Sequence, residues 1–196
     1  MILPIVAYGD PVLRKKTEEI DENYPDLGGL VASMFETMYN AYGVGLAAPQ
    51  VGLPIRLFVI DASPFAEDED LDTEEQEQLK DFKKAFINAR ILEETGEEWA
   101  FNEGCLSIPN IREDVSREEK IKIEYYDEKF VKHVEEYDGL IARVIQHEYD
   151  HIEGILFTDK LSPLKKRLLK GKLANISKGK IKVDYKMRFP EAKKAR

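Results

Sequence analysis

The run Gln-His-Glu-Tyr-Asp-His at residues 146–151 constrains this chain more than any other feature of its sequence. It lies in a periodic stretch at 140–152, preceded by Asp-Gly, which predicts a helix. In a helix, His147 and His151 lie on one face with their Cβ atoms ~5–6 Å apart. Apolar residues continue this face and would direct both imidazoles into an apolar interior; they are Leu140, Val144 and Ile155.

Two imidazoles in an apolar interior need partners, because an unpartnered buried polar group is costly. A metal ion would satisfy both rings, and histidines at this spacing are typical metal ligands. Glu148, beside the first histidine, would lie near an open coordination position, where a carboxylate can accept a proton from water. The run therefore predicts a metal site with Glu148 as the general base. Outside such a site, Glu148 would be an ordinary exposed helical residue.

The third ligand must come from elsewhere in the chain, and the single cysteine, Cys105, is the candidate. It stands in Glu-Gly-Cys-Leu-Ser at 103–107, where a glycine allows close backbone approach, and a thiolate binds iron or zinc strongly. Without a metal, a lone cysteine is usually a small buried apolar residue. One thiolate and two imidazoles leave a coordination position open, as in catalytic sites. His133 would close the site as a fourth ligand, but its strand setting favours a surface position.

Small residues gather in Gly-Val-Gly-Leu-Ala-Ala-Pro-Gln at 43–50. Read alone, this run indicates only a tight turn. It also lets backbone groups approach a ligand closely, and Gln50 offers an uncharged amide that can donate a hydrogen bond to an oxyanion.

The remaining pattern predicts an α+β fold, with antiparallel sheets wrapped around the buried helix that carries the His-Glu-x-x-His motif. Apolar residues at helical spacing predict a helix at about 26–41, whose Met and Phe stripe is a core face. Strands are expected as an edge segment at 2–7, buried strands at 55–61 and 85–92, and a hairpin of 121–126 with 131–137. A further helix should begin after Ser162-Pro163, and residues 181–189 alternate as a final strand.

A chain of 196 residues is the size of one domain. We expect a catalytic part at 1–161 and, in the same domain, a basic C-terminal extension at 162–196. The stretch 67–81, within a wider insertion at 63–84, holds nine acidic residues and one Lys. With so little apolar surface, this stretch should be exposed.

Charge is divided unevenly along the chain. Residues 162–196 hold 13 Lys or Arg and 2 Asp or Glu, a net charge of +11, while the remainder has a net charge of −20. A basic segment fits contact with nucleic acid, although such a run is more often a solvated face. One cysteine, the absence of a secretory signal and the absence of a long apolar run favour a cytoplasmic protein without a spanning helix.

Together, the runs at 43–50, 103–107 and 146–151 resemble, in the same order, the three signature motifs of peptide deformylases. The resemblance extends from about Ile2 to Leu164. It implies an enzyme that hydrolyses the formyl group from the formyl-methionine of newly synthesised bacterial or organellar proteins and releases formate, usually with Fe(II). Zn, Ni or Co would fit the same ligands.

Residue by residue, the resemblance implies that Cys105, His147 and His151 bind the metal and that Glu148 acts as acid and base. Some bacterial members dock on the ribosome through the C-terminal helix, so the basic segment is a candidate for contact with ribosomal RNA.

The resemblance also assigns the groups around the substrate. Gln50 and the backbone N–H of Leu106 would stabilise the oxyanion. Gly45 would line the substrate groove, and Val44, Leu106 and Val144 would help to form the methionine pocket.

Two features depart from the compact bacterial pattern, namely the insertion at 63–84 and the tail from 181 onward. Neither is expected to touch the three motifs. Arg143, one turn before His147, stands where an apolar residue is expected. If Arg143 reaches the groove, the preference for residues beyond methionine should change.

Two other interpretations stay open. One is a related metallohydrolase that acts on a different amide, and the other is a metal-binding or ribosome-binding module without activity. The intact Gln50, Glu148 and Leu106 positions argue against the module, since metal storage needs neither a base nor an oxyanion donor.

Overall fold

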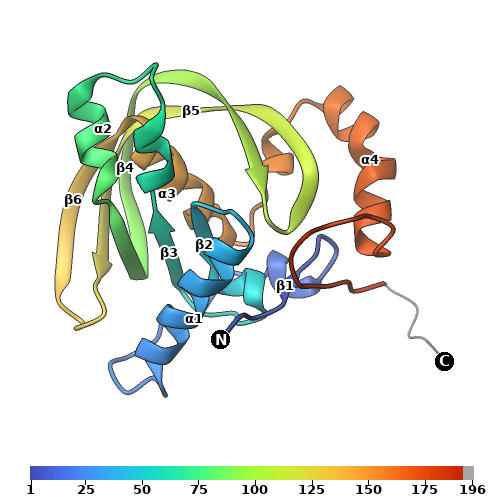
Figure 1. Cartoon of the computed structure of the whole chain (residues 1–196), viewed down its shortest axis with the longest axis horizontal. Helices are drawn as coiled ribbons and strands as arrows, with labels where there is room; N and C mark the ends of the chain where they lie inside the picture. Colours follow the sequence, from blue (N-terminus) through green and yellow to red (C-terminus); the bar gives the residue numbers. More distant parts are fainter. Residues whose placement is uncertain (192–196) are drawn as a thin grey trace.

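An antiparallel sheet of five strands frames the molecule in the computed structural model, which describes residues 1–191 (Figure 1). In order across the sheet, the strands are β2 (Gly45–Ala47), β3 (Leu57–Asp61), β4 (Lys83–Cys105), β5 (Ile108–Tyr126) and β6 (Lys132–Asp138). A separate parallel pair joins β1 (Ile5–Val6) to β7 (Met187–Arg188). Segments from near the two ends of the chain therefore lie side by side.

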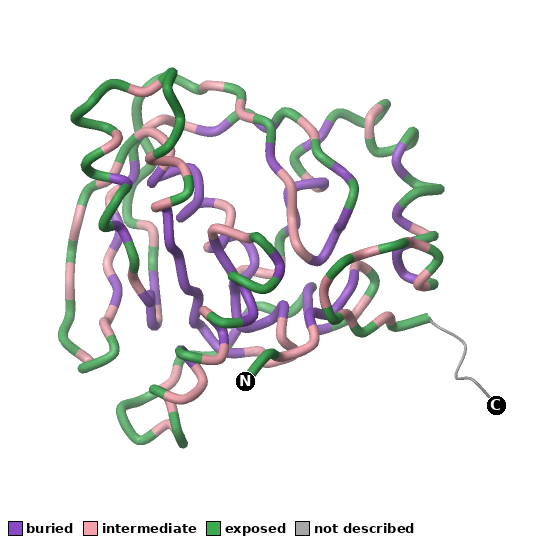
Figure 2. The backbone as a smooth tube through the Cα atoms, viewed as in Figure 1, coloured by how far each residue is buried: buried purple, intermediate pink, exposed green. Residues whose placement is uncertain are grey.

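Four α-helices accompany the sheet in the described part of the chain. They are α1 (Leu27–Asn40), α2 (Thr73–Lys80), α3 (Gly139–Ile152) and α4 (Pro163–Ser177). The sheet curves around α3, and most of the α3 residues are buried (Figures 1 and 2). The expected α+β class, with antiparallel strands around a buried helix, is confirmed. Among residues 1–191, none of the helices combines the length and the apolar character that crossing a bilayer requires.

The core lies on both sides of the sheet. One cluster joins α3 to β3, β4 and β5 and includes the stacked rings of Phe58 and Phe86. A second cluster joins α1 to β2, β3 and β4, and there Met34 and Met38 are fully buried. Burial of one such side chain stabilises the fold by about 1.5–3 kcal/mol, so the Met stripe of α1 is a core face, as expected.

The long hairpin of β4 and β5 exceeds the strand expected at 85–92. Residues beyond Ile91 are mostly polar and exposed, so they lack the apolar alternation by which a strand is recognised. Cross-strand neighbours of opposite charge help to hold them in the ladder, as in the pair of Glu93 with Lys122. Register shifts bend the hairpin, and its tip carries Cys105 toward α3.

Helix α2 occupies the acidic insertion, which is largely exposed, as expected. Its order comes from local bonds rather than from a large apolar face. Asp72 accepts a hydrogen bond from the Glu75 N–H, and Glu75 accepts one from the Asp72 N–H, which is a capping box. Leu79 and Phe82 then bury the end of the insertion against the core.

The C-terminal part begins with α4, capped by Ser162 as expected, and continues into a segment that turns back toward β1 (Figure 1). From 181 to 189 every second residue is half-buried, which agrees with the expected alternation. Among the described residues, Met187–Arg188 is the one part of 181–189 with a strand partner, so the full strand expected there is wrong. The division at residue 162 stays a prediction, and residues 192–196 of the basic extension lie outside the described part.

Candidate active site

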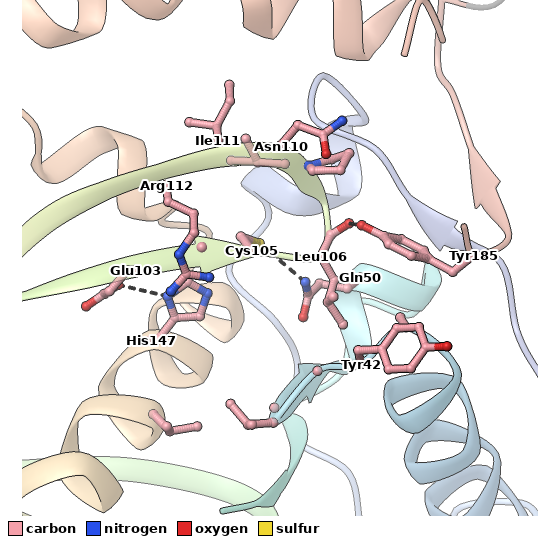
Figure 3. A pocket seen from close by; sticks show the side chains of 18 of the residues that line it. Tyr42, Gln50, Glu103, Cys105, Leu106, Asn110, Ile111, Arg112, His147 and Tyr185 are labelled. Carbon is pink, nitrogen blue, oxygen red and sulfur yellow. Dashed lines mark hydrogen bonds and ion pairs between the residues drawn. The ribbon is translucent and has the colours of Figure 1, made fainter. Parts of the chain in front are cut away.

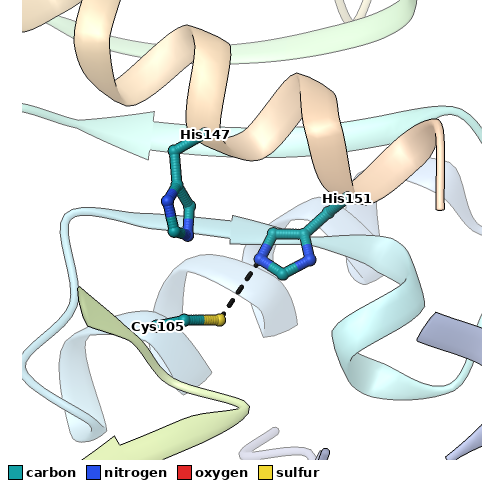
Figure 4. Close-up of side chains that lie close together, drawn as sticks. All are labelled: Cys105, His147 and His151. Carbon is teal, nitrogen blue, oxygen red and sulfur yellow. Dashed lines mark hydrogen bonds between the residues drawn. The ribbon is translucent and has the colours of Figure 1, made fainter. Parts of the chain in front are cut away.

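Helix α3 brings both histidines of the motif to one place beside the tip of the β4–β5 hairpin (Figure 4). One ligand atom from each of Cys105, His147 and His151 lies within 4.8 Å of the others. The Sγ of Cys105 is 3.3 Å from the Nε2 of His151. Ile155 does not continue this face, because α3 ends at Ile152 and Ile155 is 37% exposed.

His133 lies apart from this cluster. Its Nε2 is 2.8 Å from the Oδ2 of Asp127, at the turn between β5 and β6. The surface setting expected for His133 is therefore confirmed, and His133 is not part of the candidate cluster.

Gln50 reaches the cluster from the 3-10 turn Ala48–Val51 that follows β2. Its Oε1 accepts a hydrogen bond from the Ala47 N–H at 2.8 Å, which fixes which end of the amide faces the site. The Nε2 then donates to Cys105 Sγ at 3.5 Å and to Ser107 Oγ at 3.3 Å. The Gln50 amide is almost fully buried and lies as a hydrogen-bond donor beside the candidate ligand Cys105.

Glu103 is a site residue that the sequence reasoning missed. Its Oε2 is 2.9 Å from the Nδ1 of His147 (Figure 3). It also binds Arg117 through two hydrogen bonds. Burial alone would raise the pKa of Glu103, but hydrogen bonds from His147 and Arg117 outweigh it and hold that pKa well below its usual range. The carboxylate thus fixes the His147 ring with Nε2 free for a ligand. The period of a strand could have revealed it, because Glu103 and Cys105 share one face.

Glu148 is buried next to the first histidine, and its Oε2 has no hydrogen-bond partner among the described residues. Burial raises the pKa of Glu148 to about 7, so its carboxyl can take up and release a proton near neutral pH. Gly45 lies so close that a Cβ there would overlap Glu148 Oε1. A glycine is therefore needed at position 45, because the Glu148 side chain approaches its backbone closely. Gly45 also lines the groove expected for the substrate.

These residues fit a divalent transition metal. One sulfur and two imidazole nitrogens form a donor set suited to iron, zinc, nickel or cobalt, and Glu103 orients one of the rings. The unpartnered oxygen of Glu148, on the same helix as both histidines, adds a polar atom that still needs a partner.

A cavity of about 610 Å³ opens beside the cluster (Figure 3). Val44, Gly45, Leu106 and Val144, all expected around the substrate, line it. Glu148 and His147 also line this cavity, so the candidate base faces the same space as the apolar residues.

Arg143 lines the cavity as well, but its charged end is held inside the fold. The guanidinium lies over the Trp99 ring, with its carbon 4.4 Å from the ring centroid, and donates to Trp99 O and Val115 O. Its Nη1 is also 3.1 Å from Glu103 Oε1. Arg143 therefore bridges β4, β5 and Glu103, and its charge is not free for a substrate.

The expectation that the tail does not touch the motifs is wrong, and the same expectation for the insertion stays a prediction. Tyr185, on the C-terminal segment, donates from its hydroxyl to the backbone oxygen of Leu106 at 2.8 Å (Figure 3). Lys182 and Asp184 line the cavity, and so does Phe65 of the insertion. Sequence motifs do not show such contacts, because they join segments that lie far apart in the chain.

Comparisons with known proteins point in one direction. The model of a family described as polypeptide deformylase matches residues 2–167. A peptide deformylase from Christiangramia forsetii is 71% identical over 196 residues, 100% of each chain, and one from Flavobacterium johnsoniae is 66% identical over the same share.

Solved structures agree with the sequence relatives. The crystal structure of a peptide deformylase from Legionella pneumophila matches with a TM-score of 0.75 and 36% identity, covering 92% of this chain and 98% of that chain. A Plasmodium falciparum peptide deformylase in complex with an inhibitor matches with a TM-score of 0.73 and 34% identity, covering 88% of this chain and 97% of that chain.

Proposed function

The chain belongs to the peptide deformylase family of hydrolases, and we propose that it is a metal-dependent enzyme that acts on nascent N-formylmethionyl peptides. It hydrolyses the formyl amide and releases formate. One observation carries the proposal: Cys105, His147 and the buried Glu148 line one cavity, and His151 lies with the first two in a cluster that could hold a metal.

The proposed ligands are Cys105 Sγ and one nitrogen of each of His147 and His151. When bound, a divalent metal would supply Lewis acidity and lower the pKa of water at its open position. Fe(II) is the proposed physiological ion, and Zn, Ni or Co would also suit these donors.

Glu148 moves the protons of the reaction. Its carboxylate takes a proton from the attacking water, whose oxygen forms a bond to the formyl carbon. The bond from that carbon to the methionine nitrogen then breaks, and Glu148 gives its proton to the leaving amine. A pKa near 7 suits both steps, because the same group must accept and then donate a proton at neutral pH.

Gln50 and Leu106 stabilise the charge that develops on the formyl oxygen. The Nε2 of Gln50 is already oriented, because the Oε1 of the same amide accepts a hydrogen bond from the Ala47 N–H. Within residues 1–191, the Leu106 N–H makes no hydrogen bond, so it is available to a substrate. Fixed donors of this kind cost little reorganisation during the reaction. The methionine side chain would pack between Val44 and Val144.

Formate release from a formyl-methionyl peptide tests the proposal, with protein purified anaerobically with Fe(II). Glu148→Ala should keep its metal and lose turnover, because the ligands remain while the proton carrier is gone. Glu128→Ala, at an exposed position in the β5–β6 turn, is the matched control and should behave as the parent does.

Either of two results would contradict this reading. If the metal-loaded, folded parent releases no formate, the substrate or the role is different, and acetylated peptides are the next substrates to test. If Glu148→Ala retains full turnover, Glu148 is not the base.

Contact with ribosomal RNA through the basic segment is a further part of the proposal, as is a cytoplasmic location, where such substrates are made. Support comes from the exposed basic residues of α4, among them Lys166 and Lys170. Reversing both charges should weaken ribosome pelleting, and binding by the parent should fall steeply with salt. Retained pelleting would refute this part. Deletion of 162–196 is a poorer test, since it would also remove Tyr185.

A further inference from the structure

The segment after α4 forms part of the candidate active site, although the family model ends at residue 167. Its backbone is tied down on both sides of Tyr185. The Asn110 Nδ2 donates to Lys182 O at 3.2 Å, and the Ile5 N–H donates to Lys186 O at 2.9 Å. The position of the Tyr185 ring is therefore set by the fold rather than by the ring's own contacts alone.

Tyr185 is half-buried and packs in the same apolar cluster as Leu106. Burial raises the pKa of its phenol, so the hydroxyl stays protonated and can donate. Its partner is Leu106 O, at 2.8 Å. Among residues 1–191, this is the only hydrogen bond to the Leu106 backbone.

Leu106 and Ser107 form the two-residue turn between β4 and β5, and Ser107 has its own tethers. The Tyr8 N–H donates to Ser107 O at 2.8 Å, and Gln50 donates to Ser107 Oγ. Leu106 also packs against Gly43, where an added Cβ would lie 2.7 Å from Leu106 Cδ1. Several contacts thus hold the turn, but among residues 1–191 Tyr185 alone binds the carbonyl oxygen of Leu106.

We propose that Tyr185 is a positioning residue that orients the Leu106 turn so that the Leu106 N–H serves as an oxyanion donor. The N–H and the carbonyl of Leu106 belong to peptide planes that share the Leu106 Cα. Holding the carbonyl therefore restricts the rotation that would swing the N–H away from the formyl oxygen. This inference rests on the proposed function, in which Leu106 stabilises the oxyanion.

The substitution Tyr185→Phe in the full-length, Fe(II)-loaded enzyme tests this role, since it removes the hydroxyl and keeps the ring. We expect kcat for a formyl-methionyl peptide to fall about 2- to 10-fold, which corresponds to one lost hydrogen bond, while KM stays within about twofold. The loss should be smaller than the about 100-fold effect of removing an oxyanion donor outright. Metal content should not change.

Tyr24→Phe is the matched control. Tyr24 is also half-buried in the cluster that contains Leu106, and within residues 1–191 its hydroxyl makes no hydrogen bond. It does not line the cavity. Its kcat and KM should equal those of the parent.

The outcomes separate the two proposals. A parent that releases no formate overturns the proposed function. An active parent with an equally active Tyr185→Phe variant overturns only the role of Tyr185. A rise in KM at unchanged kcat would show that Tyr185 contributes to binding alone, and a loss of kcat that follows loss of metal would show an effect through the ligands; each of these also overturns the positioning role.

Discussion

Replacing Glu103 by Gln changes one atom of a buried carboxylate and removes its charge. Glu103 is 4% exposed and accepts hydrogen bonds from Arg117, Arg143 and His147. In the Gln variant, an amide NH₂ would face donors, and two guanidinium groups would lose a counter-ion. Breaking a buried ion pair from one side costs about 3–5 kcal/mol. Because Asp150 still binds Arg117, we expect the lower end of this range, about 3 kcal/mol.

This loss can be measured as a shift in Tm of the metal-loaded enzyme. For a domain of this size, 1 kcal/mol corresponds to about 2–4 °C, so Glu103→Gln should lower Tm by about 6–12 °C. The His147 ring also loses its anionic partner, and changes of this kind typically weaken metal binding by about 10- to 100-fold. Competition with a chelator measures that second effect.

Glu19→Gln is the control, since Glu19 pairs with Arg90 on the surface with side chains 49% and 59% exposed. Exposed pairs contribute less than about 1 kcal/mol, so its Tm should change little. If Glu103→Gln melts within about 2 °C of Glu19→Gln and competes equally for metal, then Glu103 neither stabilises the interior nor holds the His147 ring.

Three further predictions follow from the same contacts. Gly45→Ala should lower turnover at least about tenfold, because the added Cβ would displace Glu148. Gly28→Ala in α1 is the control and should keep full activity, because an added Cβ there meets nothing within 4 Å. Equal rates for the two variants would contradict this prediction. Burial opposes ionisation of Glu153, but its bond with Arg56 outweighs burial and lowers the pKa of Glu153. The pair therefore stabilises the fold above pH ~4.3, and this stabilisation is lost as pH falls through the folded pKa. The difference in unfolding free energy between the parent and Glu153→Gln should therefore vanish in acid, and a difference that is independent of pH would refute the linkage. Removing the metal with a chelator should lower Tm, and adding Fe(II) back at about 100 times Kd should restore about 2.7 kcal/mol; an unchanged Tm would mean that no metal binds the folded state.

Much of the candidate site was predictable because its residues carry local signals. The histidines lie one helical turn apart, and the period of a helix is enough to place them on one face. Cys105 was found because it is the single cysteine and stands in a short run beside a glycine. Gln50 was found because it follows a run of small residues.

The residues that sequence reasoning missed act through long-range contacts. Glu103 belongs to the run at 103–107, yet its role depends on Arg117, 14 residues further along the chain, and on His147, 44 residues further. Tyr185 is separated from Leu106 by 79 residues, and the alternation around it signals a strand rather than a bond to the site. No local pattern encodes such pairings, because the sheet and the turn-back after α4 create them.

Arg143 is another residue whose long-range contacts the sequence does not reveal. An arginine where an apolar residue is expected left open whether its charge reaches the substrate groove, since a charge at such a position needs a partner. The fold supplies that partner internally, through Glu103 and two backbone oxygens. The sequence could show that a partner was required, but it could not show that β4 and β5 provide it.

The pairing of β1 with β7 has a consequence for the order in which this enzyme matures. During synthesis the chain leaves the ribosome from its N-terminus, so residues 5 and 6 must wait for residues 187 and 188. All three candidate metal ligands have emerged once residue 151 is out, well before Tyr185. If the proposed ligands bind a metal, that site can therefore assemble on an incomplete chain, whereas the turn that carries Leu106 gains its bond with Tyr185 only after residue 185 has emerged. On the proposed function, metal loading and full catalytic competence would therefore be separate events during synthesis.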